Sequence, residues 1–178
     1  MCTTRPTRPT PWLTLSRARQ ISSDLNKGVA MAGLEDLYRE IILDHYRTPR
    51  NRGELEPPAV SAEGHNPLCG DEIRIFLDVQ GGVVTDVKFS GSGCSISQSS
   101  ASMMTNAVKG KDVAQVRAIV RKFKNMMTVE EDTETPIDEN VALGDLEALQ
   151  GVVKFPVRIK CATLGWNTLL DALDAAKA

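Results

Sequence analysis

Three cysteines and one aspartate are the residues of this chain best suited to chemistry. Cys69 and Asp71 lie two positions apart in the run Asn-Pro-Leu-Cys-Gly-Asp, Cys94 ends the run Gly-Ser-Gly-Cys, and Cys161 follows 67 residues later. Three thiols and one carboxylate make a complete tetrahedral set for Zn²⁺, and iron–sulfur clusters use the same thiolate donors. The sequence has no Cys-x-x-Cys pair, so three buried structural cysteines stay open as an alternative. The glycines beside the thiols favour a bound group, because they let the backbone approach it closely.

The pattern that precedes Cys94 predicts a β-hairpin. Two apolar runs, residues 73–79 and 83–89, are joined by Gly81-Gly82, and glycine supplies the positive φ that a two-residue turn needs at both central positions. A hairpin returns the chain to the end from which it started. We therefore expect the Cys-Gly-Asp run and Cys94 to meet at the open end of the hairpin, although the two thiols are 25 residues apart.

Helical periodicity predicts most of the remaining elements. An amphipathic helix from Leu34 to His45 is stopped by Thr48-Pro49. Further helices are expected from Cys94 to Gly110, from Val113 to Phe123, from Leu143 to Gly151 and from Cys161 onward, with a short third strand from Ala59 to Glu63 and a solvated acidic connector from Glu130 to Glu134. Both site cysteines at helix starts would then have a lowered thiol pKa, because unpaired N–H groups and the helix dipole favour a thiolate.

The two histidines are weaker candidates for the site. His45 falls in the last turn of its helix, where the helix dipole favours a cation, and we prefer that role over a catalytic one. His65 lies four residues before Cys69 and could be a ligand, but the glycine and Asn-Pro beside it indicate a solvated loop residue.

Composition excludes several classes of protein. The chain has 178 residues, enough for one domain with a substantial core, which an aromatic content of 4% makes mostly aliphatic. No apolar stretch approaches the roughly 20 residues of a membrane-spanning helix, so an integral membrane protein is not expected. Residues 1–30 carry five Lys/Arg against one Asp, and with a net charge of −2 the rest is acidic, which disfavours nucleic-acid binding. Cys2 alone in the tail and three cysteines in the body make a poor disulfide framework and indicate a reducing compartment, the cytoplasm.

Residues 1–32 are predicted to form a disordered N-terminal extension, and residues 33–178 the folded domain. The extension is rich in threonine, proline and arginine, a composition that cannot build a packed core. Three interpretations stay open. The first is an organelle transit peptide, although no convincing amphipathic helix is present. The second is an arm that binds a partner, and the third is a dispensable leader, with the natural start of the protein at Met31.

Three motifs of the sequence resemble the SufU branch of the IscU/NifU N-terminal family of iron–sulfur cluster assembly proteins. They are Asn-Pro-Leu-Cys-Gly-Asp around Cys69, Gly-Ser-Gly-Cys-Ser-Ile-Ser around Cys94, and Arg-Ile-Lys-Cys-Ala-Thr-Leu-Gly-Trp around Cys161. The resemblance runs from about Leu34 to the C-terminus and keeps the motifs in order. It implies an α+β fold in which helices pack against a three-stranded antiparallel sheet, with the site at one end.

The resemblance also implies roles for the four residues. Cys69, Asp71, Cys94 and Cys161 are expected to be zinc ligands, and Cys69 the acceptor of persulfide sulfur from a SufS-type cysteine desulfurase. The implied activity is a zinc-dependent sulfurtransferase that supplies a downstream SUF cluster-assembly scaffold. A thiolate must attack the outer sulfur of the persulfide. Zinc would keep Cys69 deprotonated but would also lower its reactivity as a nucleophile. A histidine of the partner is therefore expected to replace Cys69 on the metal.

Two departures separate this chain from the scaffold branch of the family. Lys160 stands where that branch has a histidine before the final cysteine, and residues 154–158, Lys-Phe-Pro-Val-Arg, keep only the second proline and the valine of its chaperone-docking Leu-Pro-Pro-Val-Lys. Both disfavour cluster scaffolding. The alternatives that stay open are a scaffold on which a [2Fe–2S] cluster is assembled, with iron or the cluster in place of zinc, and a zinc module whose metal only holds the fold together.

Overall fold

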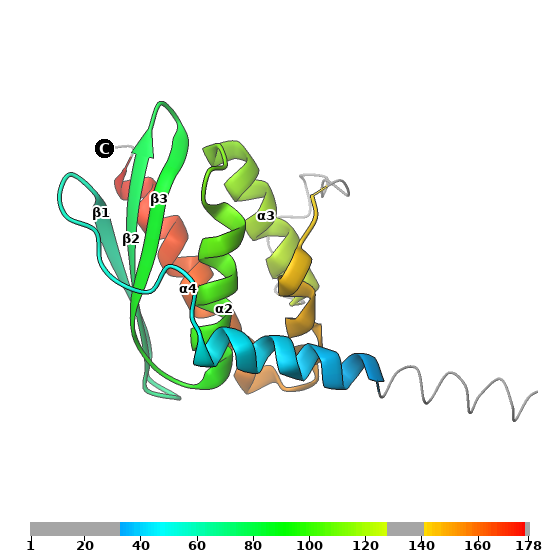
Figure 1. Cartoon of the computed structure of the whole chain (residues 1–178). Coiled ribbons are helices and arrows are strands. Elements are labelled where there is room, and N and C mark those ends of the chain that lie inside the picture. Colours follow the sequence, from blue (N-terminus) through cyan, green and yellow to red (C-terminus); the bar gives the residue numbers. More distant parts are fainter. Residues whose placement is uncertain (1–32, 128–140, 177–178) are drawn as a thin grey trace, which may run out of the picture. The chain divides into compact units, whose positions relative to one another are not determined.

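The structure, a computed structural model, describes residues 33–127 and 141–176 (Figure 1). The chain divides into two units, residues 1–36 and 37–178, and only residues 33–36 of the first are described, as helix. The predicted extension at residues 1–32, with Cys2, and the predicted acidic connector at Glu130–Glu134 lie outside the described residues. The predictions made for them stay predictions.

The second unit contains the predicted antiparallel sheet of three strands, in the order β1-β2-β3. The strands are β1 (Val60–Asn66), β2 (Asp71–Gln80) and β3 (Val83–Ser92). Gly81 and Gly82 join β2 to β3 with φ values of 59° and 79°, which confirms the predicted two-residue turn. The register places Asn66 opposite Asp71 and Glu72 opposite Ser92. The turn between β1 and β2, which carries Cys69, and the segment after β3, which carries Cys94, therefore lie at the same end of the sheet.

Strand β1 runs three residues further than predicted and includes His65, so the prediction of a loop at this residue was wrong. His65 pairs with Glu72 in the β1–β2 ladder, and its Nδ1 lies 3.4 Å from the Glu72 carboxylate. Neighbouring strand residues face opposite sides of a sheet. The buried Asn66 side chain therefore lies on the core side and the exposed His65 ring on the other.

Two helices, α2 (Ser95–Val108) and α4 (Pro156–Ala175), cover one face of the sheet. Helix α3 (Val113–Met126) and the 3₁₀ helix η1 (Gly144–Lys154) pack on these two helices, and residues 37–47 are also helical. Helix α4 contacts β1 and β2, and α2 contacts β3 and α4 (Figure 1). In β2 the buried residues Ile73, Ile75 and Leu77 alternate with exposed Glu72 and Arg74, the pattern of a strand with one covered face.

Two helices differ from their predictions in extent. The segment predicted to end at Gly151 continues as 3₁₀ helix to Lys154, because Gly151 does not take the positive φ with which glycine ends a helix. In the first helix, Ile41 and Ile42 pack against the core but Leu37 is exposed. Only the C-terminal part of this helix therefore uses its apolar face for packing. Within the described residues, no helix is both long and apolar enough to cross a membrane.

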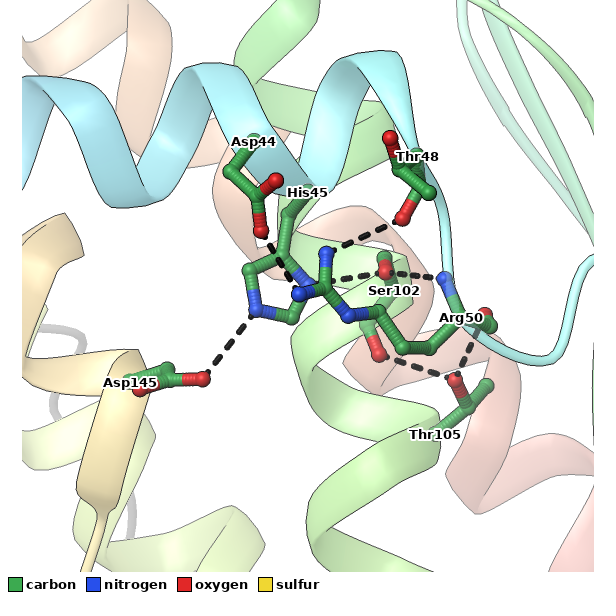
Figure 2. Close-up of polar contacts among 7 residues, drawn as sticks. All are labelled: Asp44, His45, Thr48, Arg50, Ser102, Thr105 and Asp145. Atoms are coloured by element: carbon green, nitrogen blue, oxygen red, sulfur yellow. Dashed lines mark hydrogen bonds and ion pairs between the residues drawn. The ribbon is translucent and has the colours of Figure 1, made fainter.

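His45 ties the first helix to the rest of the unit rather than serving as a cation at a helix end. Its ring is 1% exposed, and Figure 2 shows it between Ser102 of α2 and Asp145 of η1. A carboxylate can only accept, so Nε2 carries a proton and donates to Asp145 Oδ2 at 3.2 Å. The other ring nitrogen, Nδ1, lies 2.8 Å from Ser102 Oγ, which also accepts from the Arg50 N–H at 2.8 Å. Ser102, His45 and Asp145 resemble a hydrolytic triad in residue type, but Ser102 is fully buried and Asp145 is exposed, so a substrate could not reach the serine hydroxyl. The contacts of His45 therefore hold the helix in place.

Replacing this ring is expected to destabilise the fold. His45→Ala should lower the free energy of unfolding by about 2–3 kcal/mol, because it leaves a cavity and removes one of the two hydrogen-bond partners of the buried Ser102 hydroxyl. Urea unfolding measures the change from the shift of the midpoint at constant slope. The neighbouring exposed substitution Arg47→Ala is the control and should cost about 0.5 kcal/mol or less. Equal losses in both variants would contradict this role of His45.

Candidate metal centre

The carboxylate of Asp71 joins the two ends of the β2–β3 hairpin. Its Oδ1 accepts a hydrogen bond from the backbone N–H of Cys94 at 2.7 Å, and its Oδ2 lies 3.6 Å from the thiol of Cys94. The side chain is fully buried, since its relative exposure is 0%. The predicted meeting of the Cys-Gly-Asp run and Cys94 is therefore confirmed.

Cys94 is the N-cap residue of α2, as predicted. Its Sγ accepts from the Ser97 N–H at 3.5 Å, and its carbonyl accepts from the Gln98 N–H at 3.1 Å. The sulfur of Cys94 is thus fixed at the N-terminus of α2 by a backbone N–H of the first turn. The thiol is also exposed to solvent.

Cys161 lies inside α4, so the prediction that it begins a helix was wrong. The helix starts at Pro156, whose fixed φ and missing N–H suit a first helical position. Cys161 is thus in the second turn, where its Sγ faces the Val157 carbonyl at 3.9 Å. Burial raises the pKa of this thiol, and hydrogen bonds with Asp71 and Cys69 raise it further. The expected lowering of its pKa does not hold in the absence of a cation.

The side chains of Cys69, Asp71 and Cys161 form a group that could hold a metal ion. One donor atom from each lies within 4.8 Å of the others, and the two thiols are 3.3 Å apart. Bonds of about 2.3 Å to sulfur put two tetrahedral thiolate ligands about 3.7 Å apart. The group thus fits a tetrahedral metal, which would replace the thiol protons. Cys94 is not part of this group, but its thiol contacts one member of it, the Asp71 carboxylate.

Asn66 is a site residue that the sequence analysis did not single out. Its amide nitrogen lies 3.7 Å from Cys161 Sγ, and its Oδ1 accepts from the Leu68 N–H at 3.2 Å. The backbone N–H groups of Cys69 and Gly70 both donate to its carbonyl. Asn66 therefore shapes the turn that presents Cys69 and links that turn to α4. An Asn-Pro pair is an ordinary turn signal, so its contact with a distant thiol could not be foreseen.

Gly93 allows the close approach of Cys94 to Asp71. A Cβ at this position would lie 2.5 Å from Asp71 Oδ1 and 3.0 Å from its Cγ. Real Cβ atoms do not approach so closely, so the carboxylate would have to move. Gly93 thus gives room to a protein side chain, and the predicted approach of this backbone to a bound group stays a prediction.

An α+β domain with two cysteines and an aspartate clustered at one end of its sheet defines a small candidate metalloprotein. Residues 37–174 match the NifU-like N terminal domain family, and the chain belongs to that family. It is 51% identical over 138 residues to the zinc-dependent sulfurtransferase SufU of Bacillus subtilis, covering 78% of this chain and 90% of the relative. It is 38% identical to the iron–sulfur cluster assembly scaffold protein IscU of Streptococcus pyogenes, covering 82% and 87%.

Known structures agree with the fold. A crystal structure from Fervidobacterium islandicum, assigned as an iron–sulfur cluster assembly scaffold protein for the SUF system, superposes with a TM-score of 0.68 at 36% identity. It covers 75% of this chain, and this chain covers 94% of it. The N-terminal part of a NifU-like protein from Brucella abortus has the same TM-score at 25% identity, covering 81% and 98%. The expected sheet and helices are thereby confirmed as the fold of this family.

Substituting Gly93 tests the geometry of the site. Gly93→Ala should displace the Asp71 carboxylate and weaken the binding of Co²⁺, used as a spectroscopic probe, about 10-fold or more. Titration with Co²⁺ followed by visible absorption measures the affinity. Gly151→Ala is the matched control, because a Cβ there meets nothing within 4 Å, and it should bind as the wild type does. Unchanged Co²⁺ affinity in Gly93→Ala would show that the carboxylate does not depend on this glycine.

Proposed function

We propose that this protein is a zinc-dependent sulfurtransferase, which accepts persulfide sulfur from a SufS-type cysteine desulfurase for iron–sulfur cluster assembly. Cys69, Asp71, Cys94 and Cys161 are its zinc ligands, and Cys69 is the sulfur acceptor. Similarity to the SufU of Bacillus subtilis supports the activity. The donor set supports the metal, since thiolates and a carboxylate are ligands that zinc accepts.

One observation carries the assignment of Cys69 as acceptor: of the two exposed thiols, Cys69 and Cys94, Cys69 is the one that belongs to the group of donors that could hold a metal. Cys69 is exposed on the turn between β1 and β2, whereas Asp71 and Cys161 are 0% and 2% exposed. A sulfur acceptor must reach a persulfide held by another protein, and an exposed turn allows that approach. The buried pair is anchored in β2 and α4 and is suited to staying in place.

The reaction is a thiol–persulfide exchange. The Cys69 thiolate attacks the outer sulfur of the donor persulfide, forms a new S–S bond and breaks the old one. The donor leaves as a thiolate, and the Cys69 persulfide carries the transferred sulfur and its proton, so no oxidant or reductant is needed. Zinc, when bound, would hold the thiols as thiolates at neutral pH.

Exposed apolar side chains beside the site support a protein partner. Leu68, next to Cys69, is 68% exposed, and Val157, whose carbonyl faces Cys161, is 61% exposed. Phe155 precedes α4 and is 51% exposed, with the Arg158 guanidinium 4.9 Å from its ring centroid. Large apolar side chains around a reactive group are typical of a docking surface. The desulfurase is the partner we assign to it, and a downstream SUF scaffold is the next acceptor.

We place the working domain at residues 33–178 and the protein in the cytoplasm. The family match at residues 37–174 supports the domain. Two exposed thiols support a reducing compartment, because such thiols oxidise outside one.

The second candidate function is a scaffold that assembles a [2Fe–2S] cluster, which the names of several relatives favour. Metal analysis separates the two. Protein purified without oxygen should contain about one zinc per chain, because three thiolates and a carboxylate satisfy its coordination, and should keep it when Fe²⁺ and sulfide are added. Atomic emission and visible spectra measure the content. Replacement of zinc by a stable cluster would support the scaffold instead.

Removing the acceptor thiol tests the relay. Cys69→Ala should abolish the stimulation of a SufS-type desulfurase, measured as alanine released from cysteine, because no thiolate remains to take the sulfur. Cys2→Ala is the control, as it removes a thiol that is not one of the proposed ligands. Mass spectrometry of the wild type should find one added sulfur on the peptide with Cys69. Undiminished alanine release by Cys69→Ala would refute the assignment.

A further inference from the structure

The turn that follows the first helix lies along strand β3. The N–H of Phe89 donates to the Asn51 carbonyl at 3.1 Å, and the Gly53 N–H donates to the Phe89 carbonyl at 2.9 Å. Arg52, between them, forms an isolated parallel bridge with Phe89. The backbone of Arg52 is therefore fixed beside the strand that leads to Cys94.

The guanidinium of Arg52 makes two hydrogen bonds. Its Nη2 donates to the Gly91 carbonyl at 2.9 Å, and its Nη1 donates to Gln98 Oε1 at 3.3 Å. Its Cζ lies 6.0 Å from the centroid of the buried Phe89 ring. Arg52 is exposed as a residue, and of its two bonds the one to Gln98 is partly buried.

The two acceptors stand on either side of Cys94 in the chain. Gly91 is the second-last residue of β3 and lies three residues before Cys94. Gln98 lies in the first turn of α2, where its N–H donates to the Cys94 carbonyl at 3.1 Å. The Gln98 side chain is 3% exposed, and among the described residues its amide nitrogen has no partner. Its bond to Arg52 is thus the contact that orients this amide.

We propose that Arg52 is a positioning residue that holds Cys94 in place for metal binding, by bridging the Gly91 carbonyl and Gln98 across the turn that carries this thiol. The inference rests on the metal centre of the proposed function. Cys94 needs such support more than the other ligands do, because its thiol stands outside the group formed by Cys69, Asp71 and Cys161. Its turn contains two glycines, whose backbone is otherwise weakly restrained.

The test compares Arg52→Ala, Arg52→Lys and the control Arg117→Ala, which removes a partly buried arginine that pairs with Asp174 of α4. Zinc affinity is measured by competition with a chromogenic chelator. Arg52→Ala should bind zinc about 10- to 100-fold more weakly, the usual effect of losing a residue that supports a ligand. Arg52→Lys, which can reach one acceptor at a time, should be intermediate, and Arg117→Ala should match the wild type.

A spectroscopic readout separates positioning of Cys94 from general destabilisation. With Co²⁺ in place of zinc, Arg52→Ala should lose about one third of the sulfur-to-cobalt absorption, the share of one thiolate in three. Thermal unfolding of the metal-free proteins should differ little between Arg52→Ala and Arg117→Ala. Wild-type zinc affinity and absorption in Arg52→Ala, or an equal loss in Arg117→Ala, would overturn the proposal.

A second variant and a metal-free measurement cover the remaining cases. If Arg52→Ala does not fold, Gln98→Met takes its place, because it removes the hydrogen bond between Arg52 and Gln98 at nearly constant side-chain volume. Gln98→Met should weaken zinc binding several-fold, and wild-type zinc affinity in this variant would contradict the proposal. Alkylation of Cys94 in the metal-free protein, followed by mass spectrometry, should be several-fold faster in Arg52→Ala, or in Gln98→Met if Arg52→Ala does not fold. The two measurements separate the metal centre from the role of Arg52. A wild-type protein that binds no zinc would refute the metal centre, whereas an unchanged rate of Cys94 alkylation in the variant would refute the role of Arg52.

Discussion

The buried carboxylate of Asp71 is the constraint on which the rest of the site depends. A carboxylate removed from water must find partners, because an unpaired buried charge is costly. Asp71 finds them in the backbone N–H and the thiol of Cys94, across the open end of the hairpin. The register of β2 with β3 and the absence of a Cβ at Gly93 are both conditions for this contact. The sheet thus serves as a frame that brings one carboxylate to one thiol.

Two distant parts of the chain then complete the site. Helix α4 brings Cys161 to Cys69, and its position beside α2 is fixed by Ser100, which donates to the Ala162 carbonyl at 2.6 Å and accepts from Trp166 at 3.1 Å. The first helix, tethered by His45 (Figure 2), brings the following turn to β3 and α2. The two arrangements share α2, so that helix is the common support of Cys161 and Cys94.

Much of this could be predicted from local pattern. The hairpin followed from two apolar runs and a Gly-Gly pair, and the position of Cys94 at a helix start followed from the polar run after it. The start of α4 was misplaced because the helix was predicted from Cys161 onward, whereas Pro156 begins it. His65 was misjudged because glycine and Asn-Pro beside it suggest a loop, whereas pairing with β2 overrides that local signal. The contacts of Asn66, Arg52 and His45 join residues 39 to 100 positions apart. Such contacts are set by tertiary packing, which no local pattern contains.

The separation of the site residues along the chain has a consequence for how the protein matures. Asp71 and Cys94 are 23 residues apart and can meet as soon as the hairpin forms, whereas Cys69 and Cys161 are 92 residues apart. Closing the longer loop requires α4, which is synthesised after the hairpin. A nascent chain therefore holds an incomplete set of donors until α4 has been made, and the metal can be captured with all of them only after that helix has docked.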